Sequence, residues 1–98
     1  MITEIAQIDI KPGMEQDFES GVAKAAPYFK AAQNCHGMVL ERSIEKPNRY
    51  RLFVQWIAVE DHAVFRGSEG WQEWRKCVGH CFESAPQVEH VARVFTGF

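Results

Sequence analysis

Four histidines are the side chains of this sequence best suited to move a proton at neutral pH, and His62 and His90 are the strongest candidates among them. An imidazole has an ordinary pKa near 6.5, so small changes in its surroundings switch it between base and acid. His62 follows a predicted strand, and His90 lies on an otherwise aliphatic strand face. A buried polar group needs a partner, since leaving it unpaired costs about 1–3 kcal/mol. We therefore predict that His62 and His90 are catalytic, the alternative being two structural histidines.

Aromatic side chains near these histidines are candidates for holding a flat ligand. Trp56 ends the strand before His62, and an indole can stack on an aromatic ring and donate its N–H to a ligand oxygen. We therefore predict Trp56 as both a catalytic and a binding residue, against the simpler interpretation that it is hydrophobic core. The expected substrate-binding residues are Trp56, Phe65, His36, Met38 and Trp71.

Cys77 and Cys81 lie four residues apart on a predicted helix, next to His80. Zinc needs three or four ligands that converge on one point. His80 points about 100° away from Cys81 around the helix, and no second pair at zinc spacing exists in the chain. We expect buried thiols rather than a metal site. The chain also lacks a dinucleotide fingerprint, so no metal and no cofactor is predicted.

The spacing of apolar residues predicts the elements that must position these side chains. The longest helix presents Phe18, Val22, Ala25, Phe29 and Ala32 on one face, and Pro27 is expected to kink it or to start its last turn afresh. Ser68 is a plausible N-cap for the last helix. The expected strands are 2–10, 35–45, 49–58 and 88–95, with a turn at 46–48, and the expected helices are 14–32, 60–66 and 69–82.

This order predicts an α+β fold, the ferredoxin-like βαββαβ arrangement, in which both main helices cover one face of a four-stranded antiparallel sheet. The strand 49–58 carries apolar residues on both faces, with Leu52 and Val54 on one and Phe53 and Ile57 on the other. A strand with one face in water would alternate more cleanly. We therefore expect a homodimer that packs two sheets back to back and encloses a cavity between them.

Composition narrows the classes of function. The chain has 98 residues, 46% of them apolar, and a net charge of −2, which indicates one domain over 1–98 and gives no basic footprint for nucleic acid. No apolar run is long enough to cross a bilayer, so no membrane partner is expected. Residues 1–9 include Glu4 and Asp9 and do not resemble a signal peptide. With three cysteines, an odd number, a cytoplasmic location is the simplest expectation.

Several stretches resemble antibiotic biosynthesis monooxygenase domains. These are Ile10-Lys11-Pro12-Gly13, Asn34-Cys35-His36-Gly37, Val54-Gln55-Trp56, residues 60–66 of the next helix, Trp74-Arg75 and Val88-Glu89-His90. The resemblance covers nearly the whole chain and implies a dimeric α+β barrel. Members of this family are often cofactor-independent oxygenases that act on phenolic or quinol-type rings.

The resemblance implies a cofactor-independent monooxygenase for a small phenolic, quinol or anthrone-type substrate. A ring would bind against Trp56 and Phe65 in the dimer's cavity, and His62 or His90 would remove a phenolic proton. Three alternatives stay open: a non-enzymatic module that binds a small aromatic or apolar molecule, an isomerase, and a haem-degrading relative. Haem degradation of the kind known for this fold uses an Asn, a Trp and a His, where this chain has Ala6 or Gln7, Phe65, and Trp74 or Arg75.

Overall fold

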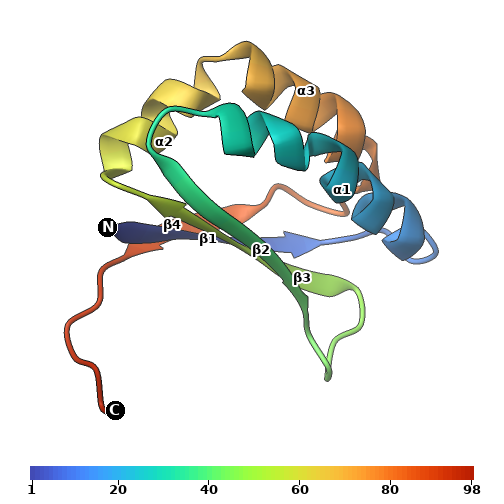
Figure 1. Cartoon of the computed structure of the whole chain (residues 1–98). Coiled ribbons are helices and arrows are strands. Elements are labelled where there is room, and N and C mark those ends of the chain that lie inside the picture. The colour runs from blue at the N-terminus through green and yellow to red at the C-terminus, as the bar shows by residue number, and fades with distance from the viewer.

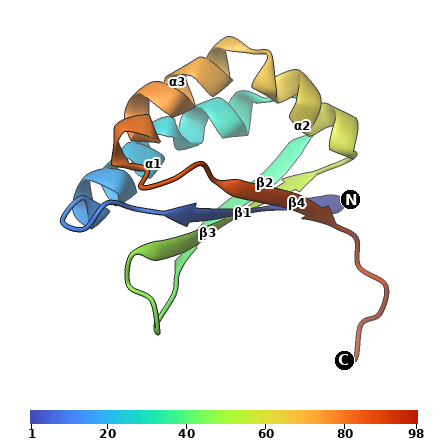
Figure 2. The ribbon, with the colours of Figure 1, turned by 180° about the vertical axis from the view of Figure 1, so that it is seen from behind.

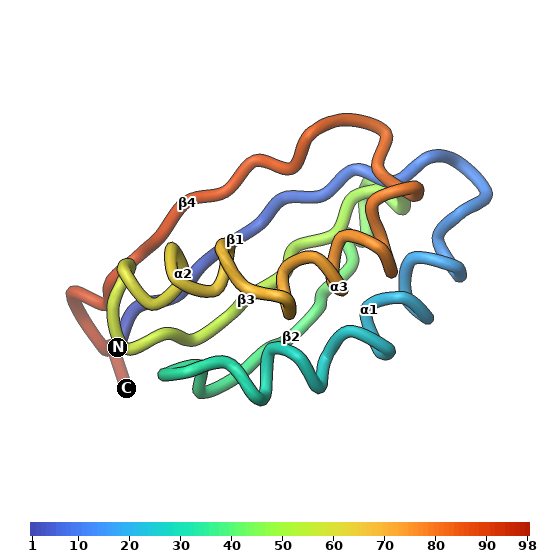
Figure 3. Tube along the Cα trace, turned by 90° about the horizontal axis from the view of Figure 1, so that it is seen from above, coloured from blue at the N-terminus to red at the C-terminus, as the bar shows by residue number.

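A four-stranded antiparallel sheet forms the base of the molecule, and all the helices lie over one of its faces (Figures 1 and 2). The computed structural model describes residues 1–98, the whole chain. The strands are β1 (Ile2–Asp9), β2 (Cys35–Arg42), β3 (Arg49–Trp56) and β4 (Gln87–Val91), and the helices are α1 (Glu15–Ala31), α2 (Val59–Arg66) and α3 (Glu69–Val78). Seen from above, β1 and β3 lie between β4 and β2 in the order β2-β3-β1-β4 (Figure 3). This is the predicted α+β ferredoxin-like fold.

The helices cover the sheet with one apolar face each. On α1, Phe18, Val22, Ala25 and Phe29 are buried at steps of four, three and four residues, and the helix runs through Pro27 without a break in its bounds. Gly21 is also buried, and a Cβ atom there would collide with the backbone oxygen of Cys77 on α3. The close approach of α1 and α3 therefore requires a residue without a side chain at this position.

The two faces of the sheet differ in burial because side chains alternate along a strand. Tyr50, Leu52, Val54 and Trp56 of β3 face the helices, and each is at most 1% exposed. The opposite face, which we call the open face, includes Phe53 from β3 and its cross-strand neighbours Ile5 and Val39. Val39 is 55% exposed, so the open face presents apolar side chains to solvent.

Three predicted elements extended three or four residues too far. The strand expected to reach residue 95 ends at Val91, because its partner β1 begins at Ile2 and supplies nothing further to pair with. The helix expected to reach residue 82 ends at Val78 and continues as a 3₁₀ turn, Gly79–Cys81. The strand expected to reach residue 45 ends at Arg42, and a six-residue loop precedes β3.

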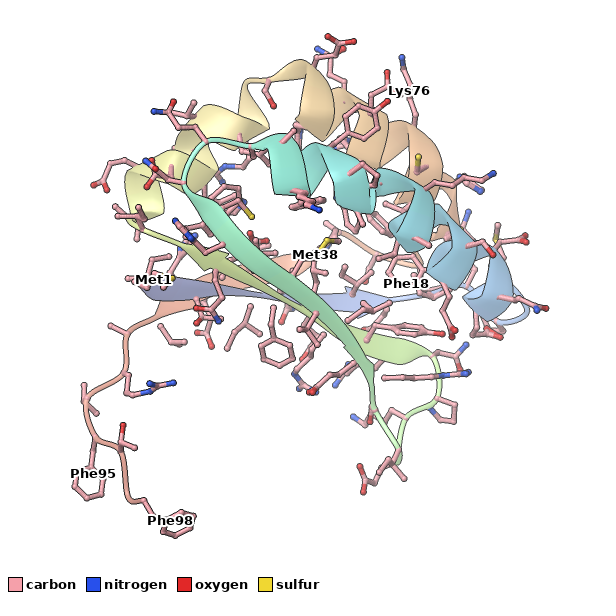
Figure 4. All side chains as sticks on the ribbon, in the orientation of Figure 1. Met1, Phe18, Met38, Lys76, Phe95 and Phe98 are labelled. Atoms are coloured by element: carbon pink, nitrogen blue, oxygen red, sulfur yellow. The ribbon has the colours of Figure 1, made fainter.

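The chain beyond β4 leaves the sheet and carries large apolar side chains. Val94, Phe95 and Phe98 are at least 81% exposed, and the two phenylalanines point away from the body of the molecule (Figure 4). None of the helices is both long and apolar enough to cross a lipid bilayer.

Candidate active site

A cavity of about 210 Å³ lies between the helix-facing side of the sheet and the helices α2 and α3. Its polar lining consists of Glu4, His62, Arg66 and Arg75. The rest of the lining is apolar and comes from every layer of the fold: Ala6, Ile8, Phe29, Leu52, Trp71, Trp74, Phe82, Pro86 and Val88. A small, mostly apolar space with a few converging polar groups is the usual form of a small-molecule site.

Glu4 is the buried acid of this cavity. It lies on β1 in phase with Ala6 and Ile8, so the alternation of the strand turns its carboxylate toward the helices, where it is 4% exposed. Trp56 donates its Nε1–H to Glu4 Oε1 at 3.0 Å, and His62 Nε2 lies 3.3 Å from the same oxygen. The second oxygen, Oε2, has no hydrogen-bond partner in the chain. Because Trp56 donates to Oε1, Oε2 is the atom of Glu4 that is free to take a proton.

The start of α2 positions His62 over the sheet. Asp61 Oδ2 accepts the backbone N–H of Ala58 at 2.9 Å, and Asp61 Oδ1 accepts the side-chain amide of Asn34, also at 2.9 Å. Asn34 has the positive φ of 63° that this residue type tolerates, in the turn between α1 and β2. These contacts fix the first turn of α2, so His62 projects inward and stacks on Trp56 at a ring distance of 5.5 Å and an angle of 17°.

His62 joins Glu4 to His90 on the neighbouring strand. His62 Nδ1 lies 2.8 Å from His90 Nε2, and His90 is also the cross-strand neighbour of Glu4 in the β1–β4 register. Which of these two nitrogens donates depends on the tautomers of the two imidazoles. Both nitrogens of His62 face protein groups, Nδ1 facing His90 and Nε2 facing Glu4.

Burial changes the protonation of both groups. Desolvation raises the pKa of Glu4 above its ordinary 4.5, while the hydrogen bond from Trp56 and the charge of Arg66 oppose the shift. Desolvation, the charge of Arg66 and that of His90 lower the pKa of His62 to about 4. His62 is therefore uncharged at neutral pH, so its 3.3 Å contact with Glu4 is not an ion pair.

Four of the predicted site residues come together here. Trp56, His62 and His90 form one contact chain, and Phe65 lies against Trp56 at a ring distance of 5.6 Å. His62 lines the cavity directly, whereas Trp56 is fully buried and its N–H is taken by Glu4. Trp56 is thus in place to hold Glu4 and His62 rather than to stack on a ligand. Trp71, half-buried on α3, does line the cavity.

Two other predicted binding residues lie elsewhere. His36 and Met38 line a separate hollow of about 660 Å³ between α1 and β2. His36 is exposed there, and Met38 packs partly against the core. The side chain of Met38 points toward the helices (Figure 4). The structure therefore does not join these two residues to the cavity that contains His62.

We expected His62, Trp56 and Phe65 to face a cavity between two sheets, and that expectation was wrong. The cavity with His62 lies inside one chain, on the helix side of the sheet. The reason is that α2 follows β3 directly and folds back over the face that α1 and α3 already cover. Strand alternation alone shows which residues share a face, not which face the helices take.

Glu4 was missed as a site residue. The signal was present in the first strand, where Glu4 stands in phase with Ala6, Ile8 and Ile10, all of which are buried. A carboxylate in the register of a core face costs several kcal/mol unless it is paired, and such a position marks a candidate functional group.

No group of three or more His, Cys, Asp or Glu side chains is arranged to hold a metal ion. Cys81 is buried and Cys77 half-buried, and both are free thiols.

Comparison with known proteins finds a matching family and similar proteins in bacteria. The family model described as antibiotic biosynthesis monooxygenase matches residues 1–76. A Bordetella bronchiseptica protein whose crystal structure carries that family's name is 55% identical, with 96% of this chain and 97% of that chain covered and a TM-score of 0.94. The uncharacterized protein YczJ of Bacillus subtilis is 36% identical over 91 residues, 92% of this chain and 96% of its own length.

More distant structures share the fold. SnoaB of Streptomyces nogalater, named as a cofactor-independent oxygenase, aligns with a TM-score of 0.82 at 16% identity. The alignment covers 98% of this chain and 95% of that one. At this identity the similarity concerns the fold alone.

Proposed function

The chain belongs to the antibiotic biosynthesis monooxygenase family, and on that premise we propose that it is a cofactor-independent monooxygenase that oxidises a single-ring quinol in the cavity beside Glu4. The observation that carries this proposal is the buried Glu4 carboxylate, which lines an apolar cavity with its Oε2 free. A carboxylate whose pKa is raised by burial is a stronger base than one in water, as removal of a phenolic proton requires.

The size of the cavity favours one ring. A cavity of about 150 Å³ lined by apolar side chains is known to hold benzene. The cavity here, of about 210 Å³, has room for one ring with a few substituents. It is smaller than a fused three-ring anthrone requires. Of the ring types that we expected from the sequence, the single-ring phenols and quinols fit best.

The reaction balances without a further reductant. Glu4 Oε2 takes a hydroxyl proton from the quinol, and the phenolate passes one electron to dioxygen. The two radicals combine, forming a ring carbon–oxygen bond, and the resulting peroxide anion takes the proton back from Glu4. The C–H proton at that carbon then leaves to Glu4, the O–O bond breaks, and hydroxide departs with this proton as water. One quinol and one dioxygen thus give one hydroxyquinone and one water.

The neighbouring residues have supporting roles in this proposal. Trp56 holds Glu4 Oε1 by its hydrogen bond and so directs Oε2 toward the ring, while His62 contacts the same oxygen and His90 positions His62. Trp71, Trp74 and Phe29 form apolar walls that exclude water from the reduced oxygen species. His62 and His90 therefore act through Glu4, while the sequence had indicated them as the bases themselves.

The proposal includes a homodimer formed through the open face of the sheet. Phe53, Ile5 and Val39 form an apolar patch there, and the chain after β4 adds the exposed Phe95 and Phe98. Contiguous exposed apolar groups of this kind mark protein interfaces. A second copy is the occupant that the fold favours, because its own open face offers the same apolar strip.

Oxygen uptake by the purified protein, stripped of metal, tests the activity. Hydroquinone, an anthrone and hemin with a reductant serve as separate substrates. We expect one dioxygen consumed per hydroquinone, little uptake with the anthrone, and none that depends on hemin. Binding of the ring without oxygen uptake would contradict the enzyme proposal and favour a ligand-binding module.

A further inference from the structure

We propose that the ring bound in this cavity carries a carboxylate, which Arg66 and Arg75 hold. This inference rests on the proposed function for the ring and its hydroxyl, and it adds the anionic substituent. The physiological substrate would then be a single-ring quinol that also carries a carboxylate, such as a dihydroxylated benzoate, rather than an uncharged quinol.

Among the arginines of this chain, Arg66 and Arg75 are the two that line the cavity, and both lack a partner within the chain. Both line the cavity, Arg66 from the end of α2 and Arg75 from α3. Neither forms an ion pair or a side-chain hydrogen bond within the chain. By contrast, Arg49 binds Asp9 at 2.8 Å, and Arg42 lies 3.7 Å from Glu19.

The charge of Arg66 reaches the inner end of the cavity. It acts on both Glu4 and His62, which line the same space. Arg66 and Arg75 are both exposed, so both line the cavity where it meets solvent. Two unpaired arginines at the rim of a mostly apolar cavity attract an anion, and the planar fork of arginine matches a carboxylate.

The two ends of such a ligand match the two ends of the cavity. The hydroxyl of a para-hydroxylated benzoate meets Glu4 Oε2, the ring lies among the apolar walls, and the carboxylate meets the guanidiniums. The reverse orientation of the ligand is disfavoured, because the ligand carboxylate would then face the Glu4 carboxylate. A neutral quinol would leave both arginines without a partner, so the arginines would contribute nothing to its binding.

A binding comparison tests this inference without any turnover. Calorimetric titration compares para-hydroxybenzoate with para-hydroxybenzamide, which has nearly the same shape and no charge. Three proteins are used: wild type, the double variant Arg66→Gln/Arg75→Gln, and Lys76→Gln as the matched control. Lys76 follows Arg75 on α3, pairs with Glu73, and points away from the sheet (Figure 4). Thermal unfolding of each variant checks that the fold is retained.

We expect wild type and Lys76→Gln to bind the acid roughly ten-fold or more tightly than the amide, since hydrogen bonds to a charged partner are the stronger ones. The double variant should bind both probes with similar affinity. Equal affinities in wild type, a preference that survives in the double variant, or failure of both probes to bind would each overturn the inference. In those cases, oxygen uptake with hydroquinone would still support the proposed activity. Conversely, a preference for the acid that depends on the arginines, without any oxygen uptake, would contradict the proposed activity but not this inference.

Discussion

His62 Nε2 lies 3.3 Å from Glu4 Oε1, with both side chains at most 6% exposed. A fully ionised pair at this depth would have to overcome the desolvation of two charges. Burial instead lowers the pKa of His62 to about 4, so the imidazole is neutral at pH 7 and lies beside the carboxylate without forming an ion pair. The site therefore holds one buried acid, which accepts the Trp56 N–H and contacts a neutral His62, and we propose Glu4 rather than either histidine as the base.

Glu4→Gln should abolish oxygen uptake with hydroquinone while leaving the fold intact. The amide oxygen still accepts from Trp56, but the amide cannot take a proton. We expect the rate to fall roughly 100-fold or more, as is typical when a general base is lost. Glu89→Gln, an exposed position on β4, is the matched control. A rate within a few-fold of wild type would rule out Glu4 as the base.

The pH profile of Trp56→Phe should separate two roles for the indole. The hydrogen bond from Trp56 lowers the pKa of Glu4, so its removal should raise that pKa and move the acid limb of kcat/KM to higher pH. In wild type this limb should already lie above pH 4.5. An increase in KM with an unmoved limb would instead mean that Trp56 contacts the substrate.

His62→Gln should change how stability depends on pH. The pKa of His62 is lowered in the folded state, so between pH 6.5 and 4 the unfolded chain binds a proton that the folded chain does not. This contribution therefore reduces stability as pH falls through that window, by about 2–3 kcal/mol at pH 4.5. Urea unfolding at pH 7 and pH 4.5 should show a smaller loss on acidification for His62→Gln than for wild type.

The comparison of variants removes the contributions of other groups. Glu4, whose pKa is raised by burial, acts in the opposite direction, because it stabilises the folded state as pH falls. His36→Gln, at an exposed position, should behave as wild type does. An identical pH dependence in wild type and His62→Gln would show that His62 has an ordinary pKa.

Phe53→Lys should convert the expected dimer to monomer. Phe53 lies on the open face between Ile5 and Val39, so the ammonium would be buried in the interface between two copies but not in the core of one. Light scattering after size exclusion measures the mass, and Phe53→Leu, which keeps the patch apolar, is the control. A wild-type monomer, or a Phe53→Lys dimer of unchanged affinity, would contradict the proposed interface.

Much of the fold could be predicted from local pattern. The helix face that runs from Phe18 to Phe29 and the alternation from Tyr50 to Trp56 are repeated along the chain at the periods of helix and strand. These periods follow from backbone geometry, which every residue shares. The ends of β4 and α3 could not be predicted this way. A strand stops where its partner does, and at the end of β4 the partner of Val91 is Thr3, 88 residues away in sequence.

The sequence by itself determined the order of the elements, the residues that share a face, and the presence of His62, His90 and Trp56 near one end of the sheet. Only the tertiary structure decided that Glu4 meets all three and that the cavity lies on the helix side. Cross-strand register brings Glu4 opposite His90 and, from the other side, opposite Val54 of β3, and the path of α2 sets which face His62 covers. Register and crossover direction depend on contacts between distant segments, and periodicity within one segment carries no information about them.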